Sequence, residues 1–127
     1  MAFENVSQWM LKAYHDLLLA RHELERPSDE MVTEGVCFHC QQCAEKALKA
    51  FLVSKHSEIS RTHDLEFLLM QCIQIDKTFE TIDTGKLSDY AVEIRYPDDF
   101  YIPEIAEAKE AYSDASIIYE FVSEKLG

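Results

Sequence analysis

The sequence predicts an all-α fold, an antiparallel up-and-down helical bundle of about five helices, with a four-helix core and one short helix. Glycine and proline are scarce, with 3 of each among 127 residues, whereas all-β folds need many turns. Apolar residues recur at spacings of three and four along several long segments, which indicates amphipathic helices. A chain of this length suits one hydrophobic core, so residues 1–127 are expected to form a single domain.

The first helix is predicted over residues 5–25, with Asn5 or Ser7 as its cap. Pro27 ends it. The inward face follows from residues at helical spacing: Val6, Trp9, Met10, Ala13, Leu17, Ala20 and Leu24. Ser28 or Asp29 is the expected cap of a second helix over residues 29–54.

Thr62 is the expected cap of a third helix over residues 63–75, whose apolar stripe includes Leu65, Leu68 and Cys72. A turn region over residues 76–85 precedes a fourth helix, predicted over residues 86–95. Pro103 suits the first turn of the last helix, which runs to about residue 124. Its inward side chains are Ile105, Ala108, Tyr112, Ala115, Ile118, Tyr119 and Val122.

The run "CFHCQQC" has the spacing of a metal box, with Cys37, Cys40 and Cys43 around His39. On a helical wheel these cysteines share an arc with small apolar residues and do not converge on one point, as the ligands of a thiolate site must. We interpret them, and Cys72, as buried core residues. No metal or cofactor is expected, and a metal bound by Cys40, Cys43 and His39 is the alternative.

The wheel places a polar set on the opposite side of the second helix, namely His39, Gln42, Lys46 and Lys49. His39 is expected to be a solvated surface residue. Gln41 and Glu45 lie one turn apart at the margin of the apolar arc. Glu45 and Lys49 have the spacing and polarity of a surface ion pair.

The formal net charge is −12, and residues 78–127 hold 12 acids against 4 bases. Non-specific nucleic-acid binding depends on basic residues that neutralise phosphates, so this function class is disfavoured. The first twenty residues lack the features of a signal peptide, and no apolar run approaches the roughly 20 residues that cross a bilayer. The sequence therefore predicts a cytoplasmic protein with no membrane contact and with reduced thiols.

Several segments together carry a family resemblance. "FHCQQCAEKALKAFLV" (residues 38–53), "RTHDLEFLL" (61–69), "EIRYP" (93–97) and the final "EIAEAKEAY" resemble HEPN domains of the prokaryotic stand-alone type. The opening "WMLKAYHDLLLAR" resembles the first helix of that family. The resemblance covers nearly the whole chain and implies a helical bundle that commonly forms homodimers. In prokaryotes such domains often occur beside minimal nucleotidyltransferases, as pairs of the toxin–antitoxin type.

Active HEPN ribonucleases carry an arginine followed, after four to six residues, by a histidine. Arg95 matches the arginine, but Phe100, Tyr101 and Ile102 occupy the positions of the histidine. A histidine manages protons near neutral pH, so its loss breaks the pattern at the catalytic base. Ribonuclease activity by this mechanism is therefore not expected.

Candidate nucleotide- or phosphate-binding residues are Arg61, His63, Arg95 and Lys49, and a candidate polar cluster contains Gln41, Glu45 and Tyr96. Each has a structural alternative: Gln41 and Glu45 can edge the core, and His63 can pack inward and bond to a backbone group. Arg95 can stabilise a helix end, and Tyr96 and Tyr101 can be packing residues.

Three functions follow from these residues. The first is a non-catalytic dimeric interaction module that partners a minimal nucleotidyltransferase. The second is a nucleotide-binding domain that uses arginine and histidine side chains, because the sequence has no glycine-rich phosphate loop. The third is a degenerate HEPN ribonuclease. We rank them in this order.

Overall fold

The structure, a computed structural model, describes residues 2–91 and 101–127, with side chains from Asn5 onward. These residues contain four α-helices and two 3-10 helices. They are α1 (Ala2–Leu24), α2 (Thr33–Ser54), α3 (Leu65–Ile75), η1 (Lys77–Thr81), η2 (Leu87–Tyr90) and α4 (Ile105–Leu126). The described part of the chain has no strand, and the predicted all-α helical bundle is confirmed.

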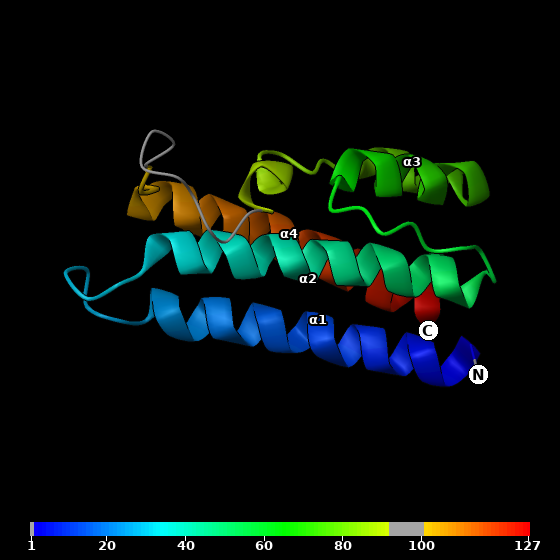
Figure 1. Cartoon of the computed structure of the whole chain (residues 1–127), viewed down its shortest axis with the longest axis horizontal. Coiled ribbons are helices and arrows are strands. Elements are labelled where there is room, and N and C mark those ends of the chain that lie inside the picture. Colours follow the sequence, from blue (N-terminus) through cyan, green and yellow to red (C-terminus); the bar gives the residue numbers. More distant parts are fainter. Residues whose placement is uncertain (1, 92–100) are drawn as a thin grey trace.

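The three long helices lie side by side, with α2 in the middle (Figure 1). α1 runs antiparallel to α2, α4 packs against α2 on another side, and the short α3 covers the side of α2 away from α1. The two termini lie at the same end of the bundle. α2 is therefore enclosed by α1, α3, α4 and η2.

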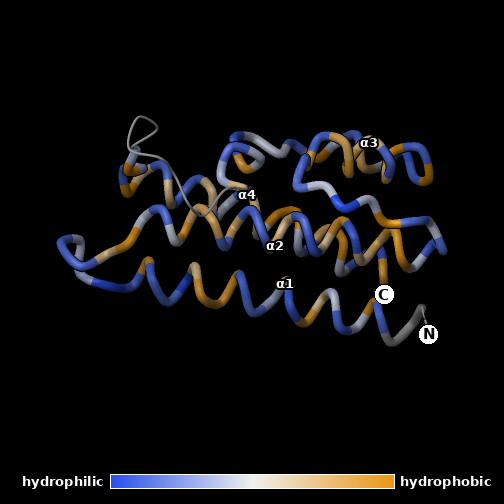
Figure 2. Tube along the Cα trace, in the orientation of Figure 1, coloured by the Kyte–Doolittle hydropathy of each residue, from blue (hydrophilic) through white to orange (hydrophobic). Residues whose placement is uncertain are grey.

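The central helix is built from small side chains that let its neighbours approach closely. Ala44, Ala47 and Cys40 of α2 are fully buried. Along α1, apolar and polar residues alternate, as expected for a helix with one buried face (Figure 2). Phe51 and Phe79, which lies on η1, fill the end of the core with ring centroids 4.5 Å apart. Burial of such surfaces is the main stabilising term for a bundle of this size.

The expected core position of the cysteines is confirmed. Cys37, Cys40, Cys43 and Cys72 are all buried and unpaired. Burial raises the pKa of Cys37, Cys43 and Cys72 to about 12, so these thiols stay protonated and unreactive. Within residues 2–91 and 101–127, no group of three or more His, Cys, Asp and Glu side chains has the arrangement of a metal site.

The start of α2 differs from the prediction. The helix begins at Thr33, not near Asp29, and its cap residue Val32 makes no side-chain capping bond. Tertiary contacts place this start: the Val32 amide donates to Glu23 at 2.9 Å, and the Thr33 hydroxyl donates to the Pro103 carbonyl at 2.6 Å. Residues 28–30 form a turn in place of the first helical turn.

The cap of α3 is also different. Asp64, and not Thr62, is the cap residue, and its carboxylate accepts the Phe67 amide at 3.3 Å. The Thr62 hydroxyl instead accepts the Asp64 amide at 3.1 Å, a local turn that competes with helix formation. The helix therefore begins two residues later than the sequence predicted.

The predicted fourth helix over residues 86–95 is wrong in its described part. A 3-10 helix over Leu87–Tyr90 takes its place, and residues 92–95 lie outside the described residues. Leu87 and Tyr90 are both buried, because residues three apart lie in line in a 3-10 helix. The turn region before it contains η1.

None of the helices in residues 2–91 and 101–127 combines the length and the apolar character that a bilayer-spanning segment needs.

We expect Ala47→Asp to unfold or aggregate the protein. Ala47 is fully buried on α2, and an unpaired carboxylate there costs at least about 3 kcal/mol, a large part of the stability of an ordinary domain. Ala106→Asp makes the same chemical change at an exposed position of α4 and should leave the urea midpoint nearly unchanged. A soluble, cooperatively unfolding Ala47→Asp variant would show that α2 is not the central helix.

Candidate functional site

A row of polar side chains runs through the buried part of α2. Gln41, Glu45 and Lys49 follow one another at intervals of four, and each is at most 6% exposed. The Glu45 carboxylate is the centre: it accepts the Lys49 ammonium at 2.8 Å and the Gln41 amide at 3.1 Å. The sequence placed Gln41 and Glu45 at the margin of the apolar arc and predicted the Glu45–Lys49 pair at the surface, whereas the structure buries all three side chains.

The helical-wheel prediction was wrong for Lys49. It was expected on the polar side of the helix, and the structure buries it with its ammonium 5.8 Å from the centre of the Trp9 ring. The pair with Glu45 is therefore a buried ion pair, in which removal of one partner leaves the other charge stranded. Burial opposes ionisation of Glu45, but hydrogen bonds from Lys49, His63 and Gln41 outweigh it and lower its pKa.

His63 joins this cluster from the segment between α2 and α3. Its Nδ1 donates at 2.8 Å to Oε1 of Glu45, the oxygen that also accepts Gln41, while 64% of the His63 side chain is exposed. The inward packing considered from the sequence is not what the ring does. Its backbone takes part separately, because the His63 carbonyl accepts the Gln41 amide at 3.2 Å.

The remaining predicted site residues are not assembled around this cluster in the described part of the chain. Arg61 is exposed in the same segment as His63. Arg95 and Tyr96 lie outside the described residues. Because the Lys49 ammonium is already paired with Glu45, it is not free to hold a phosphate, and the set proposed for phosphate binding is incomplete here.

A second buried cluster joins α1 to α2 and was missed from the sequence. Asp16, which is 7% exposed, accepts His39 at 2.8 Å and Lys46 at 2.6 Å. His39 is therefore bound to a carboxylate, not simply solvated as expected. Burial opposes ionisation of Asp16, but its bonds to His39 and Lys46 prevail and lower its pKa. A signal was available, because Asp16 interrupts the apolar stripe between Ala13 and Ala20.

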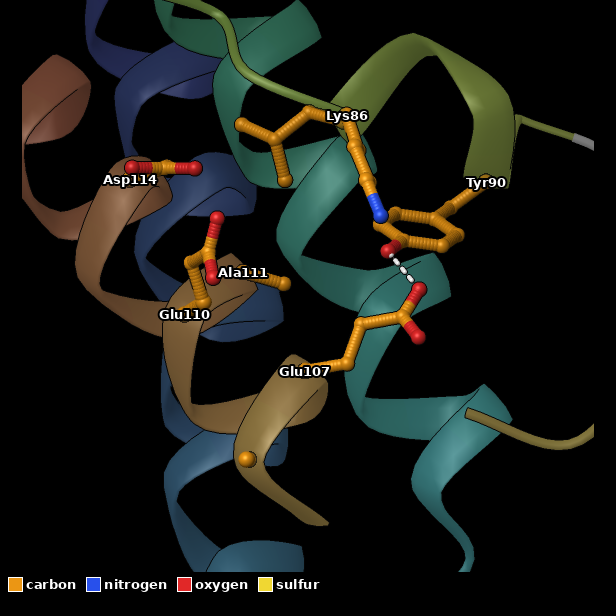
Figure 3. A pocket seen from close by; sticks show the side chains of 8 residues that line it. Lys86, Tyr90, Glu107, Glu110, Ala111 and Asp114 are labelled. Carbon is orange, nitrogen blue, oxygen red and sulfur yellow. Dashed lines mark hydrogen bonds between the residues drawn. The ribbon is translucent and has the colours of Figure 1, made fainter. Parts of the chain in front are cut away.

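A hollow of about 160 Å³ lies between η2 and α4 (Figure 3). We call it the acidic hollow, and its charged lining residues are Glu107, Glu110, Asp114 and Lys86. Burial and the neighbouring Glu110 and Asp83 raise the pKa of Asp114. The carboxylates of Glu110 and Asp114 thus increase the local negative potential that a cation would relieve.

Tyrosine hydroxyls hold one wall of the acidic hollow. Tyr90 and Tyr101 both donate to the Glu107 carboxylate, as Figure 3 shows for Tyr90. Burial opposes ionisation of Glu107, yet these two bonds lower its pKa. Tyr101, considered from the sequence as a packing or base-stacking residue, is thus exposed and bound to a carboxylate.

Gly85 allows the turn before η2 to approach Asp114 on α4. Its φ of +56° is a conformation that side chains rarely adopt. A Cβ at this position would lie 2.5 Å from the Asp114 carboxylate. The positive φ therefore favours glycine in the turn before η2, and a larger residue would also push the Asp114 carboxylate aside.

A family model, that of the HEPN domain, matches residues 6–126. The chain belongs to the HEPN domain family. The resemblance noted in the sequence is thereby confirmed over nearly the whole length. A comparison with curated proteins found no match.

Two solved structures are similar to this HEPN domain. ST0689, an archaeal HEPN homologue, is 27% identical with a TM-score of 0.68, over 96% of this chain and 98% of its own. TT1696 from Thermus thermophilus is 26% identical with a TM-score of 0.70, over 94% of this chain and 97% of its own. The likeness therefore extends over nearly the full length of both relatives.

We expect Glu45→Leu to lower the free energy of unfolding by about 3–5 kcal/mol, because it leaves the Lys49 ammonium buried without a partner. Glu45→Leu combined with Lys49→Met should recover most of the loss, since it replaces the whole pair with apolar groups. Urea unfolding at pH 7 measures both variants. A double variant no more stable than Glu45→Leu would show that the ion pair is not buried as described.

The same pair should make stability depend on pH. The pKa of Glu45 is lowered from 4.5 in the folded state, so its contribution is fully present above pH 4.5 and is lost as pH falls through the lower folded value. Wild type should lose stability more steeply than the double variant in this acidic range, and parallel curves would contradict the assignment.

Proposed function

We propose that this HEPN domain is a non-catalytic, dimeric interaction module whose acidic hollow receives a basic group of a protein partner. The observation that carries the proposal is the charge of the acidic hollow: three carboxylates against the single ammonium of Lys86. With a net charge of −12 on the chain, this surface would attract a basic partner from a distance and suppress binding of acidic ones.

The partner proposed is a minimal nucleotidyltransferase, in a pair of the toxin–antitoxin type. This choice rests on the frequent occurrence of prokaryotic HEPN domains beside such enzymes. A lysine or arginine side chain from the partner fits a hollow of about 160 Å³, and Glu110 and Asp114 would pair with its charge. An arginine would also be able to bond in bidentate fashion.

The non-catalytic part of the proposal rests on chemistry that the chain lacks. No histidine follows His63 in the sequence, so the arginine–histidine pair of active family members has no second half after Arg95. The cations considered for nucleotide binding are also reduced, because Lys49 is committed to Glu45. Both points speak against the ribonuclease and the nucleotide-binding alternatives.

The proposed homodimer would form along the edge where α1 and α4 meet. We call this surface the α1–α4 edge and define it by Tyr14 and Tyr119, which meet there, and by Leu11, Leu18 and Tyr112, which follow them at helical spacing on the same helices. Leu11 and Tyr14 are 54% and 41% exposed, and the ring of Tyr14 lies 6.0 Å from that of Tyr119. Two helices of more than 20 residues provide the length that a stable interface of about 800 Å² per partner requires.

Neutralising the acidic hollow should weaken partner binding. We expect Glu110→Gln with Asp114→Asn to raise the Kd for the proposed nucleotidyltransferase partner roughly tenfold, and to make binding less sensitive to salt. Asp29→Asn with Glu30→Gln removes the same two charges from the exposed α1–α2 turn and is the matched control. Calorimetry that gives equal affinities for both variants would reject the acidic hollow as the binding surface.

Charging the α1–α4 edge should dissociate the dimer. Leu11→Lys with Tyr14→Lys is expected to shift the protein from dimer to monomer in light scattering, because each interface would then bury four new ammonium groups. Phe67→Lys with Met70→Lys adds the same charge to the exposed apolar residues of α3 and should leave the dimer intact. If only the α3 variant dissociates, the interface lies on the other side of the bundle.

A further inference from the structure

His63 combines an exposed ring with a buried partner. Its side chain is 64% exposed, whereas the side chain of Glu45, which accepts its Nδ1 hydrogen, is only 6% exposed. A surface histidine ordinarily turns freely among rotamers. Here the ring is held at Nδ1 by the buried carboxylate of Glu45.

The segment around His63 is held at two further points. Gln41 donates to both the Glu45 carboxylate and the His63 carbonyl, and its own oxygen accepts the Gln42 amide at 2.7 Å. The Asp64 carboxylate then caps α3. Ring and backbone of His63 are thus positioned together, although the residue belongs to no helix.

This geometry selects one tautomer of the neutral ring. An ionised carboxylate only accepts hydrogen bonds, so Nδ1 carries the hydrogen and Nε2 keeps the lone pair. Within the described residues no hydrogen bond to Nε2 accompanies the one at Nδ1. A nucleophilic nitrogen is therefore presented toward solvent with its ring orientation already set.

We propose that His63 is a phosphoryl-acceptor site, modified at Nε2 by a donor of the phosphoramidate or acyl phosphate class. The Nε2 lone pair forms a bond to phosphorus as the bond between phosphorus and the leaving amine or carboxylate breaks, and the leaving group departs with that electron pair. Nδ1 keeps its hydrogen. The ring thereby gains positive charge, and the Glu45 carboxylate at 2.8 Å balances it.

The surroundings favour a phosphoryl group over a neutral acyl group. Arg61 is exposed two residues before His63, and His63 itself stands two residues before the start of the 11-residue α3, at the positive end of its dipole. The nearby carboxylates point to other donors: Asp64 accepts the Phe67 amide, and Glu66 accepts the hydroxyls of Thr84 and Ser88. Arg61 and the amino end of α3 are thus the positive features that would favour the negative charge of a phosphoryl product.

The other histidines provide controls within the same molecule. His15, His22 and His56 are exposed, and none of them has a carboxylate partner in the described structure. His39 has the same pairing with Asp16, but its side chain is only 34% exposed. If exposure alone governed reactivity, His63 would react no faster than the three unpaired histidines.

The test is to incubate the full chain with potassium phosphoramidate at about pH 8, above the ordinary imidazole pKa of about 6.5. Site occupancy is followed by mass spectrometry under alkaline conditions, and phosphorus NMR identifies the modified nitrogen. We expect His63 to react at Nε2 roughly tenfold faster than His15, His22 and His56, an effect of the size that a carboxylate partner has on a histidine that binds a metal. In urea all five histidines should react alike.

Glu45→Gln with Lys49→Met tests Glu45 as a positioning residue without stranding a buried charge. This variant should bring the rate at His63 to within twofold of the unpaired histidines while circular dichroism stays unchanged. The proposal is overturned if His63 in wild type reacts no faster than His22, if the product forms at Nδ1, or if the folded variant keeps the wild-type ratio. A variant that does not fold leaves the wild-type comparison between histidines to decide.

Discussion

The enclosure of α2 is the constraint on which the rest of the structure depends. A helix covered by α1, α3, α4 and η2 has little surface left for water, and in its middle His39, Gln42 and Lys46 are only half-buried. Its small residues allow the neighbours to approach, and its polar residues must find partners inside the protein. Glu45 shows this most clearly, because its carboxylate accepts hydrogen bonds from Lys49, Gln41 and His63. A buried charge thus organises side chains from α2 and from the segment before α3.

Carboxylates inside the bundle and at the acidic hollow differ in how completely they are paired. Asp16 and Glu45 are each matched by cations or donors, and their pKa values fall despite burial. At the acidic hollow the balance is not reached, because Glu110 and Asp83 add to the burial of Asp114 and raise its pKa. Matched charges hold the fold together, whereas a surplus of one sign is a feature that binding of a cation would relieve.

Membership in the HEPN family accounts for the architecture and leaves the chemistry to particular residues, since one fold carries many functions. Relatives at 26–27% identity keep the same overall shape. In this chain the sequence has Phe100, Tyr101 and Ile102 where active ribonucleases have histidine. The described structure instead joins a polar cluster around Glu45 to His63, in the segment between α2 and α3.

The all-α class, the order of the long helices and the core position of the cysteines could be read from the sequence, because helical periodicity and the scarcity of turn residues are local properties. The ends of helices were predicted less accurately. Val32 caps α2, where Val32 contacts Glu23 and Thr33 contacts Pro103 across long stretches of sequence, and Asp64 caps α3 after a local turn with Thr62. The burial of Lys49 and the pairing of His39 with Asp16 were decided only by tertiary structure. A helical wheel assumes one buried face and one exposed face, but α2 is covered on several sides. Polar residues such as Lys49 and His39, which the wheel places at the surface, therefore become partners of buried carboxylates once the other helices pack around α2.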